Sequence, residues 1–258
     1  MEPTILTHHK NRVGYITLNR PEKRNALSPQ MVRELADAFD QMDQNPEVKV
    51  VVLQAQGRAF CAGADLEYLH ELKDFSIEEN IEDSYRLKNL FSQIYEFPKP
   101  IIAKIEGHAM AGGCGLVTVC DFAFAVPDAL FGYTEVKIGF VPALVSVFLA
   151  EQVGQAKATE LLLSGELISA KKAAEFNLIT EVIEEDMLEE WVEKFSSKLI
   201  AENSAFSMAE TKRLLRSLGK SERHQALEAA ALANAHARTH EDCKKGLGSF
   251  LSKSKPSW

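Results

Sequence analysis

The sequence lacks the features that mark several common classes of protein. Its four cysteines have no CxxC spacing and no histidine cluster beside them, so we expect neither a metal site nor a disulfide framework, and a reducing compartment. No stretch approaches the roughly 18 apolar residues of a membrane span, and the N-terminus has neither an apolar signal core nor an Arg/Ser-rich composition. GxGxxG and GxxxxGK(S/T) patterns are missing, which gives no support to phosphate-loop chemistry. We expect a cytoplasmic protein that works without a membrane or a metal.

Charge narrows the possible partners further. The chain has 29 Lys and Arg against 37 Asp and Glu, a formal net charge of −8, which argues against nucleic-acid binding. Residues 181–193 contain seven acidic and no basic side chains, a pattern typical of a solvated helix face. Basic residues cluster near the C-terminus, at Lys244, Lys245, Lys253 and Lys255.

Hydrophobic patterning predicts an α/β fold. Strand-like apolar runs occupy the first two-thirds of the chain and alternate with helical spacing, an order typical of parallel β/α units. From residue 184 onward the pattern is helical, over 184–201, 204–217, 221–238 and 240–251. We therefore predict a core at residues 1–200 and a helical region at 201–258, with N-caps at Ser204, Ser221 and Thr239.

One segment of the core has no clear pattern. Residues 67–83 are acidic and poorly periodic, so we expect a mobile or variable segment there. Asp65 is placed to cap a helix just before it, and helical spacing returns over 83–97.

The stretch 101–140 organises the rest of the chain. An apolar run ends at Gly107, the small-residue turn Ala111-Gly112-Gly113 follows, and an apolar segment then begins. This order predicts strand, tight turn and buried helix, and the free N–H groups of such a turn favour developing negative charge. Glu135 stands twenty residues on, in an apolar neighbourhood. We interpret the stretch as one electrostatic device and one proton-transfer group.

A second turn has the same form. Residues 59–65 also run from an apolar strand through small residues to a helix start. Small residues at such turns often serve close packing alone, and that alternative stays open. Paired, the two turns could each donate one N–H to a single carbonyl oxygen and stabilise an oxyanion.

The candidate reactive side chains each have a plain structural alternative. Glu135 could be a surface or ion-paired residue, whereas burial would raise its pKa and suit it to general base work. His108 lies near the central turn, but no GxSxG pattern accompanies it. Cys61 and Cys114 flank the two turns, where a packing role is favoured over nucleophilic catalysis.

These residues resemble the crotonase family, the enoyl-CoA hydratases and isomerases, almost from end to end. The resemblance rests on Leu18-Asn19-Arg20-Pro21 with Asn25-Ala26-Leu27, on residues 60–66, on Gly107 through Gly113 with Cys120-Asp121, on Phe131-Gly132 with Glu135 and Gly139, on residues 161–174, and on Gly248-Ser249-Phe250 with Lys253 and Lys255.

The resemblance implies a fold, a substrate and a site. It implies a crotonase-like spiral of ββα units with a C-terminal helical trimerisation region, as a homotrimer or a dimer of trimers. It implies an unsaturated acyl-CoA substrate, with CoA as the acyl carrier and no other cofactor, and a thioester oxygen held by the N–H groups of Ala62 and Gly112. The residues that would bind substrate and CoA are Lys23, Arg24, Ala26, Ala62, Gly63, Ala64, Asp65, Leu66, Gly112, Phe250 and Lys253.

One departure from the hydratase pattern bears on mechanism. Hydratases of this family use two glutamates to hold and activate water; Glu135 matches the second, and the first position is Gly115. The family's single-function isomerases keep only the second glutamate. The pattern therefore favours double-bond isomerisation with Glu135 as the sole acid/base. A hydratase, for a branched or dicarboxylic acyl chain, and a catalytically weak binding or scaffold subunit remain the alternatives.

A second departure concerns the acyl pocket. Many hydratases are glycine-rich where this chain has Val141-Pro142-Ala143-Leu144-Val145. We expect these bulkier residues to line or narrow the pocket.

Overall fold

Ten strands form two sheets in a computed structural model of the protein. The structure describes residues 2–252 and 254–258, except for the side chain of Lys73. The six-stranded sheet has the order β1 (Ile5–Lys10), β2 (Val13–Leu18), β3 (Val50–Ala55), β5 (Ile101–Ile105), β7 (Phe122–Ala125) and β10 (Glu181–Val182). The four-stranded sheet has the order β4 (Ala59–Cys61), β6 (His108–Met110), β8 (Leu130–Gly132) and β9 (Ile168–Ser169).

Three pairs of consecutive strands, β3 with β4, β5 with β6 and β7 with β8, contribute to both sheets. β3, β5 and β7 are parallel neighbours in the larger sheet, and β4, β6 and β8 are parallel neighbours in the smaller one. Each pair therefore supplies one strand to each sheet before a helical segment begins. Repetition of this unit winds the chain into a spiral of ββα units, which confirms the predicted fold class.

Helices cover the sheets and follow the strand pairs. Those of the core are α1 (Pro29–Gln44), α2 (Leu66–Glu71), α3 (Ile77–Glu96), α4 (Gly112–Thr118), α5 (Ala143–Val153), α6 (Gln155–Ser164) and α7 (Ala170–Glu175), with 3₁₀ turns η1 (Pro21–Lys23), η2 (Leu72–Asp74) and η3 (Glu135–Ile138). Ser28 caps α1 by accepting from the Met31 N–H, and Pro29 occupies the first helical position. The amphipathic face of α1 then buries Leu35 and Phe39 against the sheet.

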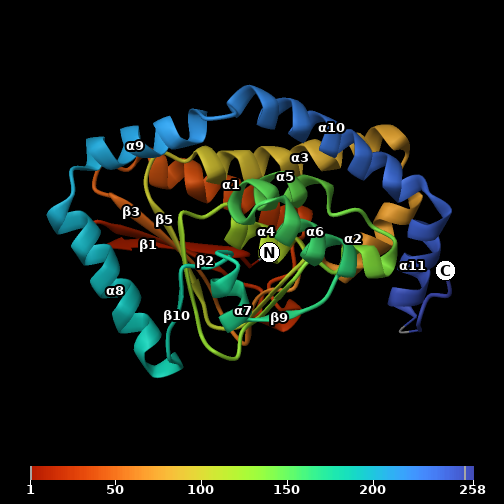
Figure 1. Cartoon of the computed structure of the whole chain (residues 1–258), viewed down its shortest axis with the longest axis horizontal. Helices are drawn as coiled ribbons and strands as arrows, with labels where there is room; N and C mark the ends of the chain where they lie inside the picture. Colours follow the sequence, from red (N-terminus) through yellow and green to blue (C-terminus); the bar gives the residue numbers. More distant parts are fainter. Residues whose placement is uncertain (1, 253) are drawn as a thin grey trace.

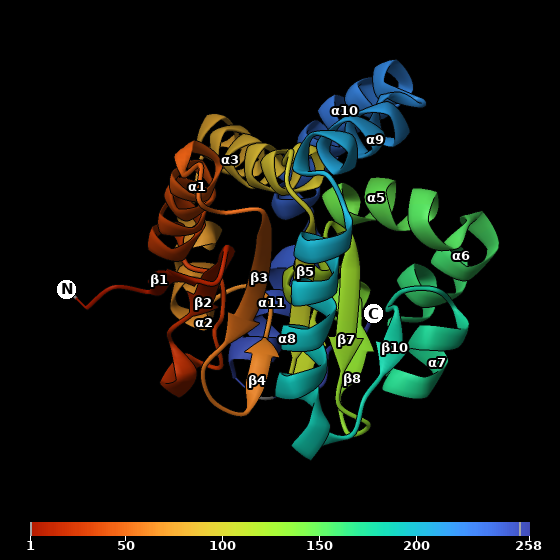
Figure 2. The same ribbon diagram turned by 90° about the vertical axis from the view of Figure 1, so that its left-hand side faces the viewer.

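The last quarter of the described chain is helical, as predicted. α8 (Glu185–Glu202) lies against the six-stranded sheet, and α9 (Ala205–Ser217), α10 (Lys220–Thr239) and α11 (Glu241–Leu251) follow. In Figure 1, α10 runs along α3 at the top of the molecule, and Figure 2 shows α8 standing in front of the strands. Among the described residues, no helix is long and apolar enough to cross a membrane.

The predicted helix caps were partly wrong. Ser204 does cap α9, accepting from the Ser207 N–H. Gly219 and His240 precede the next two helices instead, so Ser221 and Thr239 lie inside α10.

Residues 67–83, where the sequence shows no clear periodicity, are largely helical. α2 and η2 occupy its first part, and α3 starts at Ile77, six residues earlier than the predicted helix. Ser76 and Glu79 form a reciprocal capping box, each side chain accepting from the other's backbone N–H. That signal was present in the sequence, and it brings Asp83 onto a helix that faces α10.

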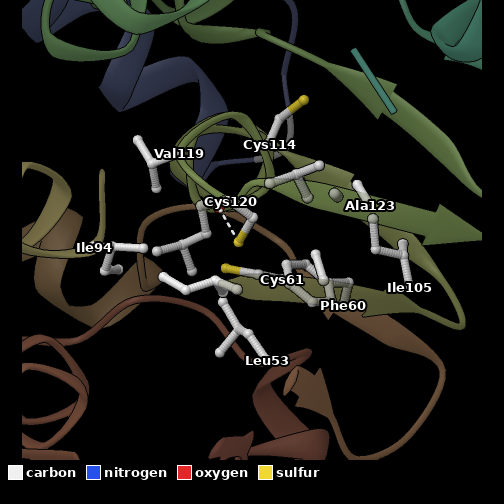
Figure 3. Close-up of a cluster of buried hydrophobic side chains, with 14 of the residues drawn as sticks. Leu53, Phe60, Cys61, Ile94, Ile105, Cys114, Val119, Cys120 and Ala123 are labelled. Atoms are coloured by element: carbon white, nitrogen blue, oxygen red, sulfur yellow. Dashed lines mark hydrogen bonds between the residues drawn. The ribbon is translucent and has the colours of Figure 1, made fainter. Parts of the chain in front are cut away.

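The interior between the sheets is closely packed and apolar. β3 and β5 are buried along most of their length, as expected of parallel strands covered on both faces. Figure 3 shows Cys61 and Cys120 among Leu53, Phe60 and Ile94 in this core. All four cysteines are free and buried, and the burial of Cys61 and Cys114 agrees with the packing role predicted for these two.

Candidate active site

The two small-residue turns meet in the structure. A Cβ built on Gly63, whose φ is +89°, would lie 2.9 Å from the Ala111 Cβ and 3.8 Å from the Gly112 nitrogen. A Cβ on Gly113 would lie 2.3 Å from the Cys61 carbonyl oxygen. The small residues thus do serve close packing, and that packing places the two backbones side by side.

Strain at Ala111 sets the direction of the second turn. Its φ of 50° and ψ of −124° are rarely adopted by a residue with a side chain. The Ala111 N–H donates to the Gly132 oxygen at 2.7 Å. Gly112 follows as the first residue of α4, where an N–H has no partner within its own helix.

In the first turn the free N–H belongs to Ala64, and not to Ala62 as predicted. The Ala62 N–H donates to the Arg24 carbonyl oxygen at 3.0 Å. Leu27 pairs with both neighbours of Ala64, because its N–H donates to Gly63 and its carbonyl accepts from Asp65. Within the described chain no acceptor is recorded for the Ala64 N–H. The prediction chose the wrong residue because the path of residues 24–27 is invisible in sequence.

That path is fixed by buried polar contacts. The Asn25 side chain accepts from the Arg20 N–H and donates to the carbonyls of Gln56 and Ala59, each at 2.8 Å. Arg20 also pairs with Asp65 at 2.8 Å. Asp65 in turn caps α2, as predicted, by accepting from the Glu67 and Tyr68 N–H groups. These bonds, together with the Arg20 guanidinium, lower the pKa of Asp65 despite its burial.

The structure divides the predicted binding residues. A pocket takes in Ala62, Ala64, Gly112, Glu135 and Phe250. Outside its lining lie Lys23, Arg24, Ala26, Gly63, Asp65 and Leu66. Asp65 is buried in its cap, and Lys23 pairs with Glu67 on the surface at 2.6 Å. Lys253 lies outside the described residues.

Glu135 stands at the end of β8, where packing from two directions holds it. Just before it, the buried Tyr133 hydroxyl hydrogen-bonds the Thr118 hydroxyl of α4 at 2.5 Å. Behind it, α11 lies close enough that a Cβ on Gly139 would be 2.4 Å from the Asp242 oxygen. The strand end and the C-terminal helix therefore fix η3 and its first residue.

The Glu135 carboxylate has no partner for its buried Oε2 atom within the described chain. Burial raises the pKa of Glu135 from 4.5 to about 7, against a small lowering by its own backbone N–H. A group poised near neutrality can both take and return a proton. This environment excludes the surface alternative that the sequence left open.

The space beside Gly115 is filled by apolar atoms. A Cβ on Gly115 would lie 2.5 Å from Val145 Cγ1 and 3.1 Å from Phe91 Cζ. A carboxylate side chain at this position would therefore clash with both residues. The two departures from the hydratase pattern, at residue 115 and at residues 141–145, therefore lie against each other in the structure.

The pocket has a volume of about 390 Å³ and is mostly apolar, which suits a small organic ligand. Residues 141–145 all line it, as predicted. Polar groups gather where α3 and α10 meet, and sequence reasoning missed them. They are Tyr68, Asp83, Arg86, Asn234 and Arg238.

The remaining candidate nucleophiles have structural roles. His108 Nδ1 accepts from the Leu130 N–H at 3.1 Å. Burial raises the pKa of the Cys61 thiol, and that of the Cys114 thiol, to about 12, which leaves both protonated and unreactive near neutral pH.

A repeated ββα spiral with a pocket at its paired turns is the crotonase fold. The family model for enoyl-CoA hydratase/isomerase matches residues 8–258. The chain belongs to the enoyl-CoA hydratase/isomerase family.

Individual relatives agree over nearly their whole length. A Thermus thermophilus protein, provisionally named an enoyl-CoA hydratase, is 40% identical over 247 residues, covering 96% of this chain and 97% of that protein. The 2,3-dehydroadipyl-CoA hydratase of Escherichia coli is 29% identical, with 98% of each chain covered. The crystal structure of an enoyl-CoA hydratase from Mycobacterium avium superposes with a TM-score of 0.88 at 31% identity, and all of both chains is covered.

Proposed function

We propose that the protein shifts the double bond of an unsaturated acyl-CoA thioester. The thioester oxygen sits between the N–H groups of Ala64 and Gly112, and the acyl chain extends into the apolar pocket. Two preorganised donors stabilise negative charge on that oxygen, and removal of one such donor costs about 3–4 kcal/mol in other enzymes.

Glu135 moves the proton in this scheme. Its carboxylate takes a proton from C2 of a 3-enoyl-CoA, and the electrons of that bond move toward the thioester oxygen as a dienolate. The same carboxylic acid then returns the proton at C4, which leaves a 2-enoyl-CoA and restores Glu135. The atoms balance with no oxidant, reductant or water, so CoA is needed only as the carrier.

The observation that carries this proposal is that no second unpaired carboxylate accompanies Glu135 in the described lining of the pocket. Two carboxylates line the described part of the pocket, Glu135 and Asp83, and Asp83 is held by Arg238 and Tyr68. The position of a second catalytic glutamate is Gly115, and Val145 and Phe91 occupy the space beside it. One unpaired carboxylate fits a proton shuttle better than a water clamp.

Hydration of a 2-enoyl-CoA is the second candidate. It is favoured by the names of the relatives, because proteins named as hydratases align with nearly the full chain. In this case Glu135 alone would orient and deprotonate the water. Gly115 would provide no second carboxylate to hold that water.

A homotrimer or a dimer of trimers is part of the proposal. α9 and the turn after it expose four large apolar side chains, each between 58% and 75% accessible. They are Phe206, Leu214, Leu215 and Leu218. A surface of this kind is suited to contact with another subunit.

The deciding experiment offers both substrates to the same enzyme. A 3-enoyl-CoA in heavy water should give 2-enoyl-CoA, followed by mass spectrometry, faster than a 2-enoyl-CoA gives 3-hydroxyacyl-CoA. Faster hydration would reassign the enzyme to the second candidate. A Glu135→Gln preparation supplies the background rate, and binding of the thioesters without any turnover would point to a scaffold subunit.

A further inference from the structure

Tyr133 is a buried polar side chain to which the proposed mechanism gives no role. It lies between β8 and Glu135 and is fully buried. Burial raises the pKa of its hydroxyl well above the usual value of 10, so the phenol stays neutral near neutral pH. Tyr133 is not among the described residues that line the pocket. Its hydroxyl therefore acts through the protein contacts that it makes, and not by touching substrate.

The Tyr133 hydroxyl begins a chain of two hydrogen bonds that ends on α4. Thr118 Oγ1 donates to the Cys114 carbonyl oxygen at 2.9 Å, and a threonine hydroxyl has a single proton to donate. The Tyr133 hydroxyl, which lies 2.5 Å from Thr118 Oγ1, is therefore the donor in the second bond. Both side chains are buried, so this bond is made away from solvent and is not exchanged for one to water.

Two contacts join α4 to the end of β8, one at each end of the helix. At the start of α4, the Ala111 N–H donates to the Gly132 oxygen at 2.7 Å and holds the turn that precedes Gly112. At the other end, the bond from Tyr133 reaches Thr118, the last residue of the helix. The rise of an α-helix over these six residue steps is about 9 Å. Two adjacent residues of one strand end therefore hold two well-separated points of α4.

Two separated contacts fix the direction of a helix, whereas a single contact leaves a pivot. With the Ala111 bond alone, α4 could tilt about its first turn, and the Gly112 N–H would move relative to Glu135. The buried side chains of α4 limit such a tilt to a small displacement. Small displacements matter at a reacting centre, because a misplacement of about 1 Å can cost roughly 10²-fold in rate.

We propose that Tyr133 is a positioning residue, whose hydrogen bond to Thr118 holds the Gly112 N–H and the Glu135 carboxylate at the separation that proton transfer requires. The inference rests on the function proposed above, in which Gly112 stabilises the thioester oxygen and Glu135 moves the proton. Both groups must act at once, since negative charge reaches the oxygen as the proton leaves C2. Binding of a saturated thioester has no such requirement. Loss of the Tyr133 hydroxyl should therefore lower kcat and spare affinity.

Tyr133→Phe tests the inference, because it removes the hydroxyl and keeps the ring. With a 3-enoyl-CoA we expect kcat to fall roughly tenfold, while the Kd of a saturated acyl-CoA, measured by calorimetry, changes by less than about twofold. A merely structural hydroxyl would lower the melting temperature and leave the kcat of the folded enzyme unchanged. A Tyr133→Phe enzyme with the kcat of the parent would therefore overturn the proposal.

Tyr95→Phe is the matched control. Tyr95 is also buried and donates its hydroxyl to Glu151 at 2.8 Å, but it is not among the described residues that line the pocket and it makes no printed contact with α4. This variant should lose stability, as Tyr133→Phe does, and keep its kcat. An equal loss of kcat in both variants would contradict the proposal, because the effect would then follow from the loss of any buried phenol hydroxyl.

Variants of Thr118 examine the same bond from its other side. Thr118→Val keeps the shape of the side chain without its hydroxyl, so kcat should fall as in Tyr133→Phe. The double variant should lose no more than either single variant, since both remove one interaction. Thr118→Ser keeps the hydroxyl and should keep most of the parent rate. Equal losses in the valine and serine variants, or additive losses in the double variant, would overturn the proposal.

The parent enzyme separates this inference from the proposed function. Faster hydration of a 2-enoyl-CoA by the parent would overturn the proposed isomerisation, and a fall in that rate in Tyr133→Phe would still support the role of Tyr133. Normal isomerisation by the parent and by Tyr133→Phe would overturn the inference alone. A parent that turns over neither thioester would overturn both.

Discussion

The pocket has two carboxylates in opposite situations. Asp83 receives Arg238 and the Tyr68 hydroxyl, and its side chain is pinned between three helices. Among the residues that the structure describes, none bonds the buried Oε2 atom of Glu135, and burial raises the pKa of its carboxyl to about 7. The same functional group is a structural contact at one end of the pocket and the proposed proton acceptor at the other.

The comparison teaches that neighbours decide chemical role. A carboxylate that accepts from a guanidinium and a hydroxyl is held in place as a structural contact. A carboxylate in an apolar setting pays for its isolation in stability and is ready for acid–base chemistry. Substitutions at each end should therefore have effects of opposite kind.

The largest effect should follow from removing the proton carrier. Glu135→Gln keeps the shape of the side chain and cannot take a proton, so turnover should fall by roughly 10³-fold. Affinity for a saturated acyl-CoA should change little, because the amide fills the same space. Steady-state kinetics with calorimetry checks both; a variant that retains turnover would assign the base elsewhere.

Matched carboxylate-to-amide changes should move stability in opposite directions. Asp83→Asn leaves the buried Arg238 without a counter-charge and should lower the free energy of unfolding by about 3 kcal/mol. At pH values above 7, Glu135→Gln should raise the free energy of unfolding by no more than about 3 kcal/mol. Urea unfolding of both variants at pH 8 checks the pair, and a loss of stability in both would contradict the contrast.

The pH dependence of the Glu135 effect has a definite sign. The folded-state pKa of about 7 lies above the ordinary 4.5 of the unfolded chain, so the native state holds the extra proton between these values. The contribution of Glu135 to the stability of the parent protein should therefore fall as pH rises from 4.5 to 7. The gain in Glu135→Gln should vanish below pH 4.5, and a gain that persists there would have another cause.

A smaller effect is expected from adding a side chain at residue 115, the position of the second catalytic glutamate in the hydratase pattern. Gly115→Ala places a methyl group 2.5 Å from Val145 Cγ1, so we expect a loss of about 2 kcal/mol. Gly248→Ala in α11 is the matched control, since a Cβ there meets nothing within 4 Å, and helix propensity should make it neutral or slightly stabilising. Thermal unfolding compares them, and Val145→Ala combined with Gly115→Ala should restore part of the loss.

A further prediction concerns the pH dependence of the rate. If free Glu135 must be ionised to take the C2 proton, kcat/KM should rise about tenfold per pH unit and level off above about pH 7. A rate profile from pH 5 to 9 on a 3-enoyl-CoA measures it. A profile that is flat across this range would remove Glu135 from the proton transfer.

Much of the fold was predictable from local patterns. The Val-rich run of β3 and the apolar run of β5 indicate buried parallel strands, and the four C-terminal helices fall within two residues of their predicted ends. The early start of α3 was missed, although Ser76 and Glu79 carried the signal, because the acidic residues after them hide the helical spacing.

The site was predictable only in outline. Glu135 and the glycine turn are recognisable in the sequence, and the structure brings them to one pocket. The choice between Ala62 and Ala64 depends on which N–H the Arg24 carbonyl occupies, and that carbonyl comes from a loop almost 40 residues earlier. The pair formed by Asp83 and Arg238 joins residues 155 positions apart, and no local pattern announces it.

By itself, the sequence determined the strands, the turns and the single carboxylate, because these follow from spacing, glycine and side-chain type along short segments. For the part of the chain that is described, the tertiary structure decided which N–H groups are free and that Glu135 Oε2 lacks a partner while Asp83 has two. It also placed Val145 and Phe91 in the space beside Gly115. Hydrogen-bond satisfaction and burial depend on every neighbour that folding brings into contact, and these neighbours come from distant parts of the chain.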